Sequence, residues 1–392
     1  MNRDLFQTLD NYLLTDQQQQ FRQQVQEFFR SQNFWNILKN SQLEKNDEID
    51  PRRIYKLIAE HGLLAVHWPQ SFGGQGKTMV ELAILVEEMI NAEIPETLFI
   101  LSILFVGGLI LLLDDSQQKE KWLPEMAAGN CFVSILYSES GAGSDLAALK
   151  TRATKINDEE YEITGRKLYS LKSQFCDYGL CAVRTRESDS KYDGITLILI
   201  PLRAEGVCIK PIPSMTKEVF QEVIFEKVKV SEKNIVGKLN EGWLAISKAL
   251  WFERTGLDYV LKINQLLSIL THCLEHQSLP NQAEIINQLL YFGVKRDAVR
   301  IMSYSLLNQY QKDKAIDETK ASMAKWYASE LAMQIIQFGI ENLDFFKLSQ
   351  QSTVALDAFA MAYRDIPGTR LSAGSSEMML EMIAGLQFKK IG

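Results

Sequence analysis

The sequence of 392 residues predicts an α+β fold in which a small β domain lies between two helical regions. Three observations lead to this prediction. Apolar residues recur at helical spacing up to about residue 128, short β-branched and aromatic runs separated by turn residues follow up to about residue 232, and long amphipathic stretches fill the rest. We therefore expect three domains, at residues 1–128, 129–232 and 233–392.

The first region has the start signals and the period of amphipathic helices. Thr15 and Asp16 are typical N-cap residues, and phenylalanine and valine side chains then recur at three- and four-residue steps over residues 21–29. Residues 79–90 repeat this pattern. Between the two helical patterns, the glycine-rich residues 71–77 predict a loop.

One apolar run, residues 98–113, raises the question of a membrane span. Its 16 residues include only Ser102 as a polar side chain, whereas a helix that crosses a bilayer needs about 20 apolar residues. The run also contains Gly107 and Gly108 in its middle. We therefore expect a buried core helix and a soluble protein. The N-terminus lacks the pattern of a secretory signal, which favours a cytoplasmic location.

The composition excludes several classes of protein. With 46% hydrophobic and 23% charged residues, the chain is neither disordered nor fibrous, and its net charge of −7 provides no positive field for nucleic acid. The five cysteines form no metal-type pair, and their odd number suits reduced thiols. His272 and His276 share a helix face, but a solvated pair is the expected arrangement there. No metal site is predicted.

The middle region reads as strands. Its runs are short, rich in β-branched and aromatic residues, and bounded by glycine, aspartate and asparagine turns. The expected strands lie within residues 131–138, 160–170, 178–186, 194–202 and 223–230.

After Gly242 the strand signals end and helical patterns return. The expected helices cover residues 243–272, 281–312, 315–342 and 350–364, with breaks at residues 278–280 and near Asp344.

The string YSESGAGSD, residues 137–145, directly follows a predicted strand. Its small residues allow backbone N–H groups to approach a ligand closely. Ser138 and Ser144 supply hydroxyls that can bond a phosphate or the polar edge of a flat heterocycle. Taken alone, the string also fits an ordinary glycine- and serine-rich turn.

Other strings, in the same order along the chain, make this one informative. Together with YSESGAGSD they resemble the motifs of the acyl-CoA dehydrogenase-like flavoprotein family. They are LIAEHGLLAVHWPQSFGGQG (57–76), KWLPEMAAGN (121–130), ITGRKLYSLKS (163–173), VIFEKVKVSEKNIVGKLNEGW (223–243), MAKWYASE (323–330) and AYRDIPGTRLSAGSSEMMLEMIAGL (362–386).

The resemblance implies an N-terminal helical domain, a middle β-barrel-like domain and a C-terminal four-helix bundle, assembled as a homodimer or homotetramer. It implies FAD as cofactor and α,β-dehydrogenation of an acyl thioester to the 2-enoyl thioester as reaction. The acyl group would be carried by coenzyme A or by an acyl carrier protein. Electrons would pass to an electron-transferring flavoprotein or to oxygen.

The resemblance also assigns the cofactor contacts. They fall on Tyr137, Ser138, Ser144, Tyr169, Ser170, Gly374, Ser375 and Glu377. Tyr169 takes the place of a tryptophan that shields one face of the flavin. Leu171 stands where the family usually has a threonine that bonds the flavin, so that hydrogen bond is expected to be absent or made elsewhere.

The catalytic base is the first of two larger departures. Many family members carry a glutamate at the position of Ala373, and a methyl group cannot accept a proton. The long-chain and isovaleryl branch carries its glutamate within "ER" on the first C-terminal helix, which corresponds to Glu253 and Arg254. We expect Glu253 to be the base and Ser144, Arg254 and Ala373 to contact substrate. The alternative for Glu253 is a surface carboxylate paired with Arg254 or Lys248.

The second departure concerns the grip on the adenosine half of FAD. Residues 270–282 lack the family's "R..FG", and its glycine-rich loop is reduced to QIIQFGIENLD, residues 334–344.

Two other functions stay open on this evidence. One is a flavin-dependent monooxygenase of the same fold, which Ala373 favours and Glu253 disfavours. The other is a degenerate partner subunit without FAD.

Overall fold

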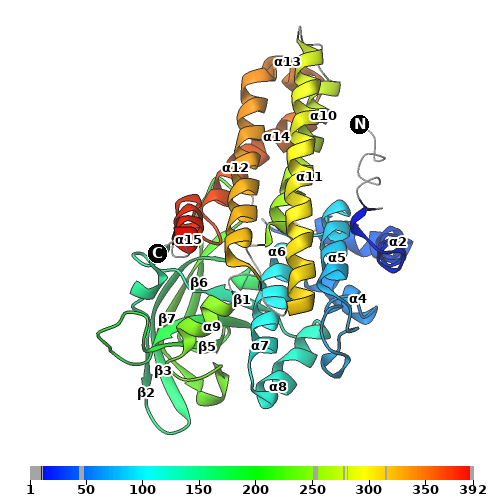
Figure 1. Ribbon diagram of the computed structural model, residues 1–392. Coiled ribbons are helices and arrows are strands. Elements are labelled where there is room, and N and C mark those ends of the chain that lie inside the picture. The colour runs from blue at the N-terminus through cyan, green and yellow to red at the C-terminus, as the bar shows by residue number, and fades with distance from the viewer. Residues whose placement is uncertain are drawn as a thin grey trace. The chain divides into compact units, whose positions relative to one another are not determined.

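The computed structural model describes residues 10, 12–43, 48–216, 218–249, 255–276, 279, 281–313 and 316–388. The chain forms two compact units. Unit 1 comprises residues 1–23, 215–217 and 253–392, and unit 2 comprises residues 24–214 and 218–252. Unit 2 contains the β domain and the helices of the N-terminal region from residue 24 on, while unit 1 contains the first part of α2 and the C-terminal helices from α10 on (Figure 1). The α+β prediction is confirmed.

The first predicted helix start is where its capping signal places it, and a second cap is visible in the structure. Helix α2 (Asp16–Arg30) follows Thr15, whose Oγ1 accepts a hydrogen bond from the backbone N–H of Gln18 at 3.3 Å. Helix α5 (Met79–Asn91) begins after Thr78, which forms a capping box with Glu81. The other helices of this region include α3 (Gln32–Leu43), α4 (Arg52–Glu60) and α8 (Ser116–Ala127).

The apolar run of residues 98–113 is helical and largely buried, as predicted, but it is not one regular helix. It consists of α6 (Thr97–Phe99), the π-helix η2 (Ile100–Gly107) and α7 (Gly108–Leu112). Trp68, which is fully buried, lies directly against Gly107. Across the described parts of the chain, we find no helix that combines the length and the apolar character needed to cross a membrane.

The β domain is an eight-stranded mixed sheet in the described part of unit 2, with the order β6-β7-β3-β2-β4-β5-β8 and β1 paired with β4. The strands are β1 (Val133–Leu136), β2 (Arg152–Lys155), β3 (Glu160–Leu171), β4 (Tyr178–Arg184), β5 (Ile195–Pro201), β6 (Val207–Ile212), β7 (Phe220–Ser231) and β8 (Ile235–Val236). The five predicted strands are confirmed. The sequence analysis missed β2, β6 and β8. Strand β2 is mostly polar and β8 has two residues, whereas β6 is apolar in sequence but contains Pro211 and has no fully buried residue.

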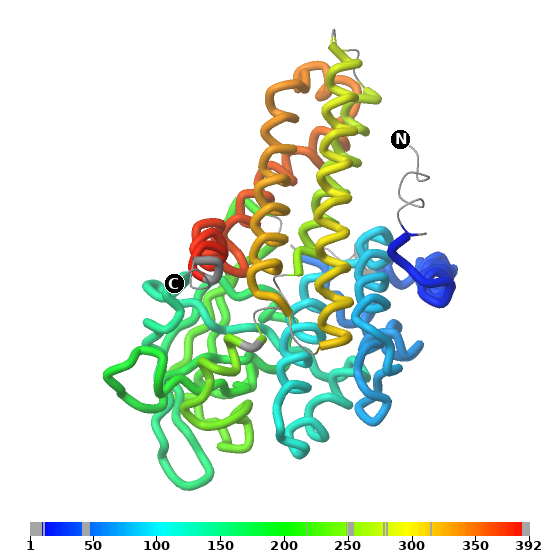
Figure 2. Tube along the Cα trace, viewed as in Figure 1, coloured from blue at the N-terminus to red at the C-terminus, as the bar shows by residue number. Residues whose placement is uncertain are grey.

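Unit 1 is built on long helices, which Figure 2 shows as extended coils. They are α10 (Leu257–Glu275), α11 (Gln282–Asp313), α12 (Glu318–Asn342) and α14 (Thr353–Asp365), with α13 (Phe345–Gln351) and α15 (Ser376–Phe388) beside them. Leucine, isoleucine and phenylalanine side chains from α10, α11, α12 and α14 form one continuous core.

One predicted helix is wrong in its extent. Residues 243–272 do not form a single helix: α9 (Gly242–Ala249) belongs to unit 2, and α10 starts only at Leu257. Gly256 precedes α10 with φ of 78°, a left-handed conformation that an uninterrupted helix does not allow. The short helix α13 was also missed, although its N-cap, Asp344, is where the sequence placed a break.

His67 in unit 2 makes the fold sensitive to acid, because both of its ring nitrogens are buried although the residue as a whole is half-buried. Neither of its ring nitrogens has a hydrogen-bond partner among the described residues. Burial lowers the pKa of His67 to about 3, because the charged ring cannot be solvated there.

We expect His67→Phe to reduce the loss of stability in acid. Below a pH of about 6.5 the unfolded chain takes up a proton that folded His67 refuses, so stability falls as the pH drops. Between pH 8 and pH 5 this costs wild type about 2 kcal/mol of unfolding free energy, and the variant lacks that loss. Urea unfolding at both pH values measures it, and equal losses in the two proteins would contradict the assignment.

Candidate active site

The loop of residues 137–145 leaves the end of β1 in unit 2 and forms a tight turn. The backbone N–H of Glu139 donates to the carbonyl of Ala142 at 3.0 Å. A Cβ built at Gly141 or at Gly143 would meet no atom within 4 Å, so open space lies over both residues. Ser144 is exposed and Ser138 half-buried.

Strand β3 holds the same loop through contacts of Lys167 and Leu168. The Nζ of Lys167, a side chain with no exposed surface, donates to the carbonyl of Tyr137 at 3.0 Å and lies 2.7 Å from Oε1 of Glu139. The N–H of Leu168 donates to the carbonyl of Ser138 at 2.9 Å. Three successive residues of the loop are therefore held in place.

The end of β3 presents two faces. Tyr169 is 59% exposed and has φ of 60°, with its ring against Phe220 at a centroid distance of 6.1 Å. Ser170 is buried on the opposite face, where its hydroxyl donates to the carbonyl of Gln221 at 3.2 Å. Any contact of Ser170 with a cofactor would therefore involve its backbone. Leu171 is half-buried and offers no hydroxyl.

A buried cluster that the sequence did not reveal holds this strand end. The Nζ of Lys172 lies 2.8 Å from Glu218 and 2.5 Å from Glu48, and Thr97 donates to Glu218 at 2.8 Å. Burial alone would lower the pKa of Lys172, but the two carboxylates outweigh it and raise that pKa. Its charge thus ties two loops and the start of α6 to the strand that carries Tyr169.

In unit 1, the loop of residues 369–376 has a strained backbone that α12 holds in place. Ala373 and Gly374 have φ of 55° and 97°. Fully buried Lys325 donates to the carbonyls of Thr369 at 3.1 Å and Gly374 at 2.7 Å. This fixes the backbone on both sides of Ala373, where a non-glycine residue rarely has positive φ.

Glu330 adds a second attachment from the same helix. One of its oxygens accepts hydrogen bonds from Nε of Arg370 at 2.8 Å and from Oγ of Ser376 at 2.7 Å. Glu377 lies at the start of α15. Hydrogen bonds from the backbone N–H of Glu377 and from the hydroxyl of Ser375 lower the pKa of the Glu377 carboxyl. Gly374, Ser375 and Glu377 therefore belong to one helix-start segment.

The beginning of α10 lies against this loop. The hydroxyl of Tyr259 is 3.3 Å from Oγ of Ser372, and burial raises the pKa of Asp258 despite the positive charges of Lys262 and Lys325. Glu253 and Arg254, the predicted base and its neighbour, lie outside the described residues.

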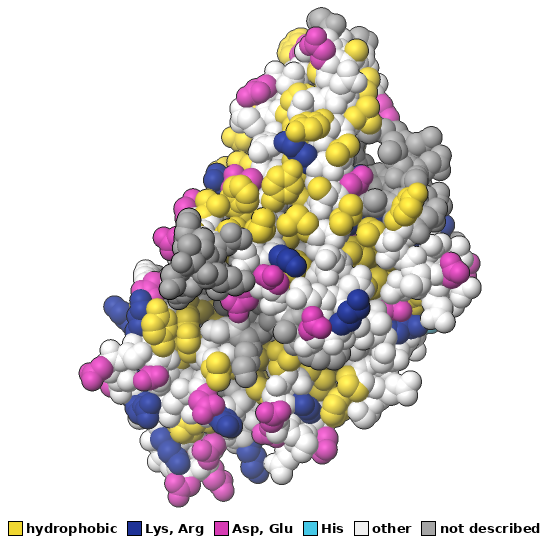
Figure 3. Space-filling view, viewed as in Figure 1, with side chains coloured by type: hydrophobic (Ala, Val, Ile, Leu, Met, Phe, Trp, Pro, Cys, Tyr) yellow, Lys and Arg dark blue, Asp and Glu magenta, His cyan; other side chains and the backbone are white. Residues whose placement is uncertain are grey.

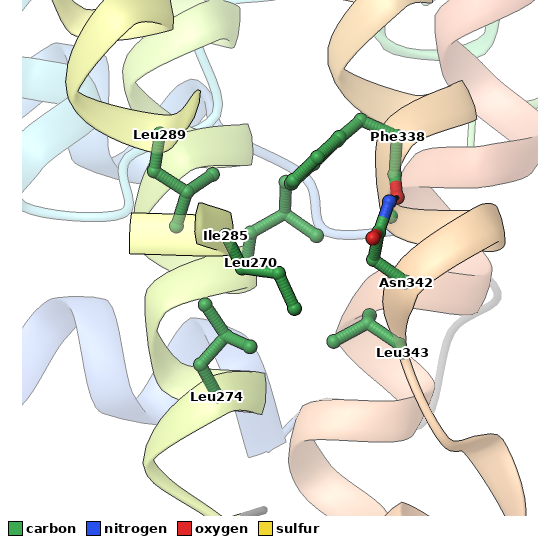
Figure 4. A pocket seen from close by; sticks show the side chains of 8 residues that line it. Leu270, Leu274, Ile285, Leu289, Phe338, Asn342 and Leu343 are labelled. Carbon is green, nitrogen blue, oxygen red and sulfur yellow. Dashed lines mark hydrogen bonds between the residues drawn. The ribbon is translucent and has the colours of Figure 1, made fainter. Parts of the chain in front are cut away.

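The stretch that replaces the family's glycine-rich loop is the last part of a helix. Helix α12 continues to Asn342, and a Cβ built at Gly339 would lie 2.5 Å from the ring of Phe359 and 2.7 Å from Leu270. Gly339 therefore permits helix packing and does not face a ligand. Figure 4 shows a pocket beside it, lined by Leu270, Leu274, Ile285, Leu289, Phe338, Gly339, Asn342 and Leu343. Its volume of about 10 Å³ is far too small for an acyl chain.

The 137–145 loop and Tyr169 fit the flavin that the sequence implies. Within the described chain, the hydroxyls of Ser138 and Ser144 make no hydrogen bond that would compete with a ligand. The open space over Gly141 and Gly143 leaves room for a close approach, and the exposed ring of Tyr169 supplies an apolar surface on the adjacent strand.

Comparison with known proteins identifies the family to which the chain belongs. Family models described as the N-terminal, middle and C-terminal domains of acyl-CoA dehydrogenase match residues 15–130, 134–228 and 240–386. The acyl-CoA dehydrogenase FadE26 of Mycobacterium tuberculosis is 30% identical over 297 residues, which cover 73% of the chain and 74% of that protein. The caffeyl-CoA reductase-Etf complex subunit CarC of Acetobacterium woodii is 24% identical over 393 residues, 96% of the chain and 99% of that protein.

A solved structure extends the agreement to the fold. The crystal structure of the ChsE4-ChsE5 complex from Mycobacterium tuberculosis superposes with a TM-score of 0.81 at 25% identity, covering 96% of the chain and 98% of its counterpart. The chain belongs to the acyl-CoA dehydrogenase family, whose members are flavoprotein oxidoreductases that act on the CH–CH bond of acyl-CoA.

Proposed function

We propose that the protein binds FAD and converts an acyl thioester to its 2-enoyl thioester, with Glu253 as the base. The observation that carries the proposal is the 137–145 loop, which is fixed by buried contacts and has open space over Gly141 and Gly143. Coenzyme A is the proposed carrier, because relatives with that carrier in their names match this chain over most of its length. A carrier-protein thioester is the alternative substrate.

The residues of the site have distinct roles in this reaction. Bound FAD supplies the acceptor for the hydride from the β carbon. Glu253 takes the α proton, and the backbone N–H of Ala373 polarises the thioester carbonyl, a role that needs no side chain. Lys325 acts through the backbone, because its two carbonyl contacts keep that N–H in one orientation. Ser144 and Arg254 are proposed to contact the substrate.

The purified protein is expected to be yellow, and the cofactor released on denaturation is expected to be FAD rather than FMN. An acyl-CoA added in the absence of oxygen should bleach the flavin, because reduced flavin loses the visible absorbance that makes the protein yellow. Absorbance spectra and chromatography of the released cofactor measure both. If only an acyl group on a carrier protein bleaches it, the carrier assignment changes while the reaction stands.

An FAD-free partner subunit is the second candidate function. It is favoured by the continuous helix α12, which occupies the stretch where the family's glycine-rich loop contacts the adenosine. Colourless protein that also fails to take up added FAD would exclude the flavoenzyme and leave this second function standing. The ChsE4-ChsE5 relative is itself described as a complex of two subunits.

We also propose that the protein passes electrons to an electron-transferring flavoprotein, as the name of the CarC relative suggests. A further proposal is that the protein is a homo-oligomer assembled through unit 1. Helix α11 exposes apolar side chains at steps of four and seven residues, and Figure 3 shows apolar atoms gathered over α11 and α12. The exposed residues on α11 include Ile286, Leu290, Val294 and Ile301.

Light scattering at micromolar concentration is expected to give at least the mass of a dimer. Val294 is 66% exposed in the chain, so Val294→Glu should disfavour association without disturbing the core of unit 1. A monomeric mass for wild type would contradict the proposed assembly.

A further inference from the structure

The 137–145 loop and its close surroundings contain two lysine–carboxylate pairs that differ in burial. Lys167 and Glu139 are 2.7 Å apart, with 0% and 10% of their side chains exposed. Lys191 and Asp145 are 2.8 Å apart, with 47% and 55% exposed. The two pairs have the same chemistry and nearly the same distance, so any difference in their roles comes from burial.

Both members of the buried pair also form hydrogen bonds with the backbone. The carboxylate of Glu139 accepts hydrogen bonds from the backbone N–H groups of Lys150 at 2.7 Å and Thr151 at 3.0 Å, besides its contact with Lys167. Lys167 in turn donates to the carbonyl of Tyr137. The loop start is thereby attached to β3 and to the chain entering β2.

Because the pair is buried, the loss of any of these contacts is costly in free energy. The desolvated ammonium of Lys167 requires both of its oxygen partners, so a change in the loop would leave a buried charge without compensation. Burial alone would raise the pKa of Glu139, but the charge of Lys167 and the hydrogen bonds from Lys167 and Thr151 outweigh it and lower that pKa. The exposed pair of Lys191 and Asp145 is screened by water and restrains the loop little.

We propose that Lys167 is a positioning residue which holds the 137–145 loop, through the carbonyl of Tyr137 and the carboxylate of Glu139, in its FAD-binding conformation before FAD arrives. The inference rests on the proposed binding of FAD. A loop ordered in advance loses less conformational entropy on binding, so the pair raises the affinity for FAD without touching the cofactor.

The test compares three full-length proteins after removal of FAD: wild type, the double variant Glu139→Gln/Lys167→Met, and the matched control Lys191→Met. The double variant removes both buried charges together, so its thermal midpoint should stay near that of wild type. Its dissociation constant for FAD, measured by quenching of flavin fluorescence, should rise at least tenfold. Lys191→Met should stay within twofold of wild type.

Hydrogen exchange of the loop amides supplies a readout that a purely structural role would not move. In flavin-free wild type, the hydrogen-bonded amides of Glu139, Gly141 and Ala142 should already be protected, and in the double variant they should exchange faster. The proposal is overturned if the double variant binds FAD as tightly as wild type. It is also overturned if the wild-type loop becomes protected only after FAD is added, a measurement that does not depend on any variant folding. Failure of wild type to bind FAD would instead refute the proposed function.

Discussion

Replacement of Glu253 by glutamine is expected to slow bleaching of the flavin by acyl-CoA by about 100-fold or more, while FAD stays bound. Glutamine keeps the shape of the side chain and removes its basicity, and general-base catalysis contributes about this factor. An apolar acyl pocket would raise the pKa of a carboxylate toward the working pH, and Leu250, Trp251 and Phe252 precede Glu253 in the sequence. Anaerobic stopped-flow absorbance measures the rate.

Two further variants make the assignment sharper. Asp258→Asn removes another carboxylate near the start of α10, and it should keep most of the rate if Glu253 is the base. Adding Ala373→Glu to Glu253→Gln should restore part of the activity, because the family resemblance places a base at that position in many members. If the Glu253→Gln variant bleaches at the wild-type rate, Glu253 is not the base but a surface carboxylate. If Asp258→Asn loses the bleaching rate instead, Asp258 is the base.

Gly107→Ala is expected to lower the free energy of unfolding by about 2 kcal/mol, the usual range for overpacking a core. The new Cβ would lie 2.1 Å from Cζ2 of Trp68, which is fully buried and has no free space to move into. Denaturant unfolding measures the change.

Gly293→Ala in α11 is the matched control, because its Cβ would meet no atom within 4 Å. The same substitution there should stabilise the protein by about 0.5–1 kcal/mol, since alanine is the better helix former. Equal effects at the two glycines would show that helix propensity, and not the contact with Trp68, decides the result.

Local patterns predicted most of the helices and the longer strands. Thr15 lies at the helix start that it indicates, and the apolar strand β5 lies where its composition predicts. These signals are local, because a helix or strand period is written into consecutive residues. Strand β2 carries no such signal, since three of its four residues are exposed and it is held by pairing with β3.

The sequence by itself determined the family, the order of helical and β regions, and the candidate site residues, because the family's motifs are contiguous strings. Only the tertiary structure decided what holds the site. It showed that Ser170 turns inward, that Lys325 fixes the backbone on both sides of Ala373, and that Lys167 is buried against Glu139. These contacts join residues 28 or more positions apart, and nothing in a local pattern distinguishes such a buried lysine from exposed Lys191. Burial depends on which distant segments pack together, so it becomes visible only when the chain is folded.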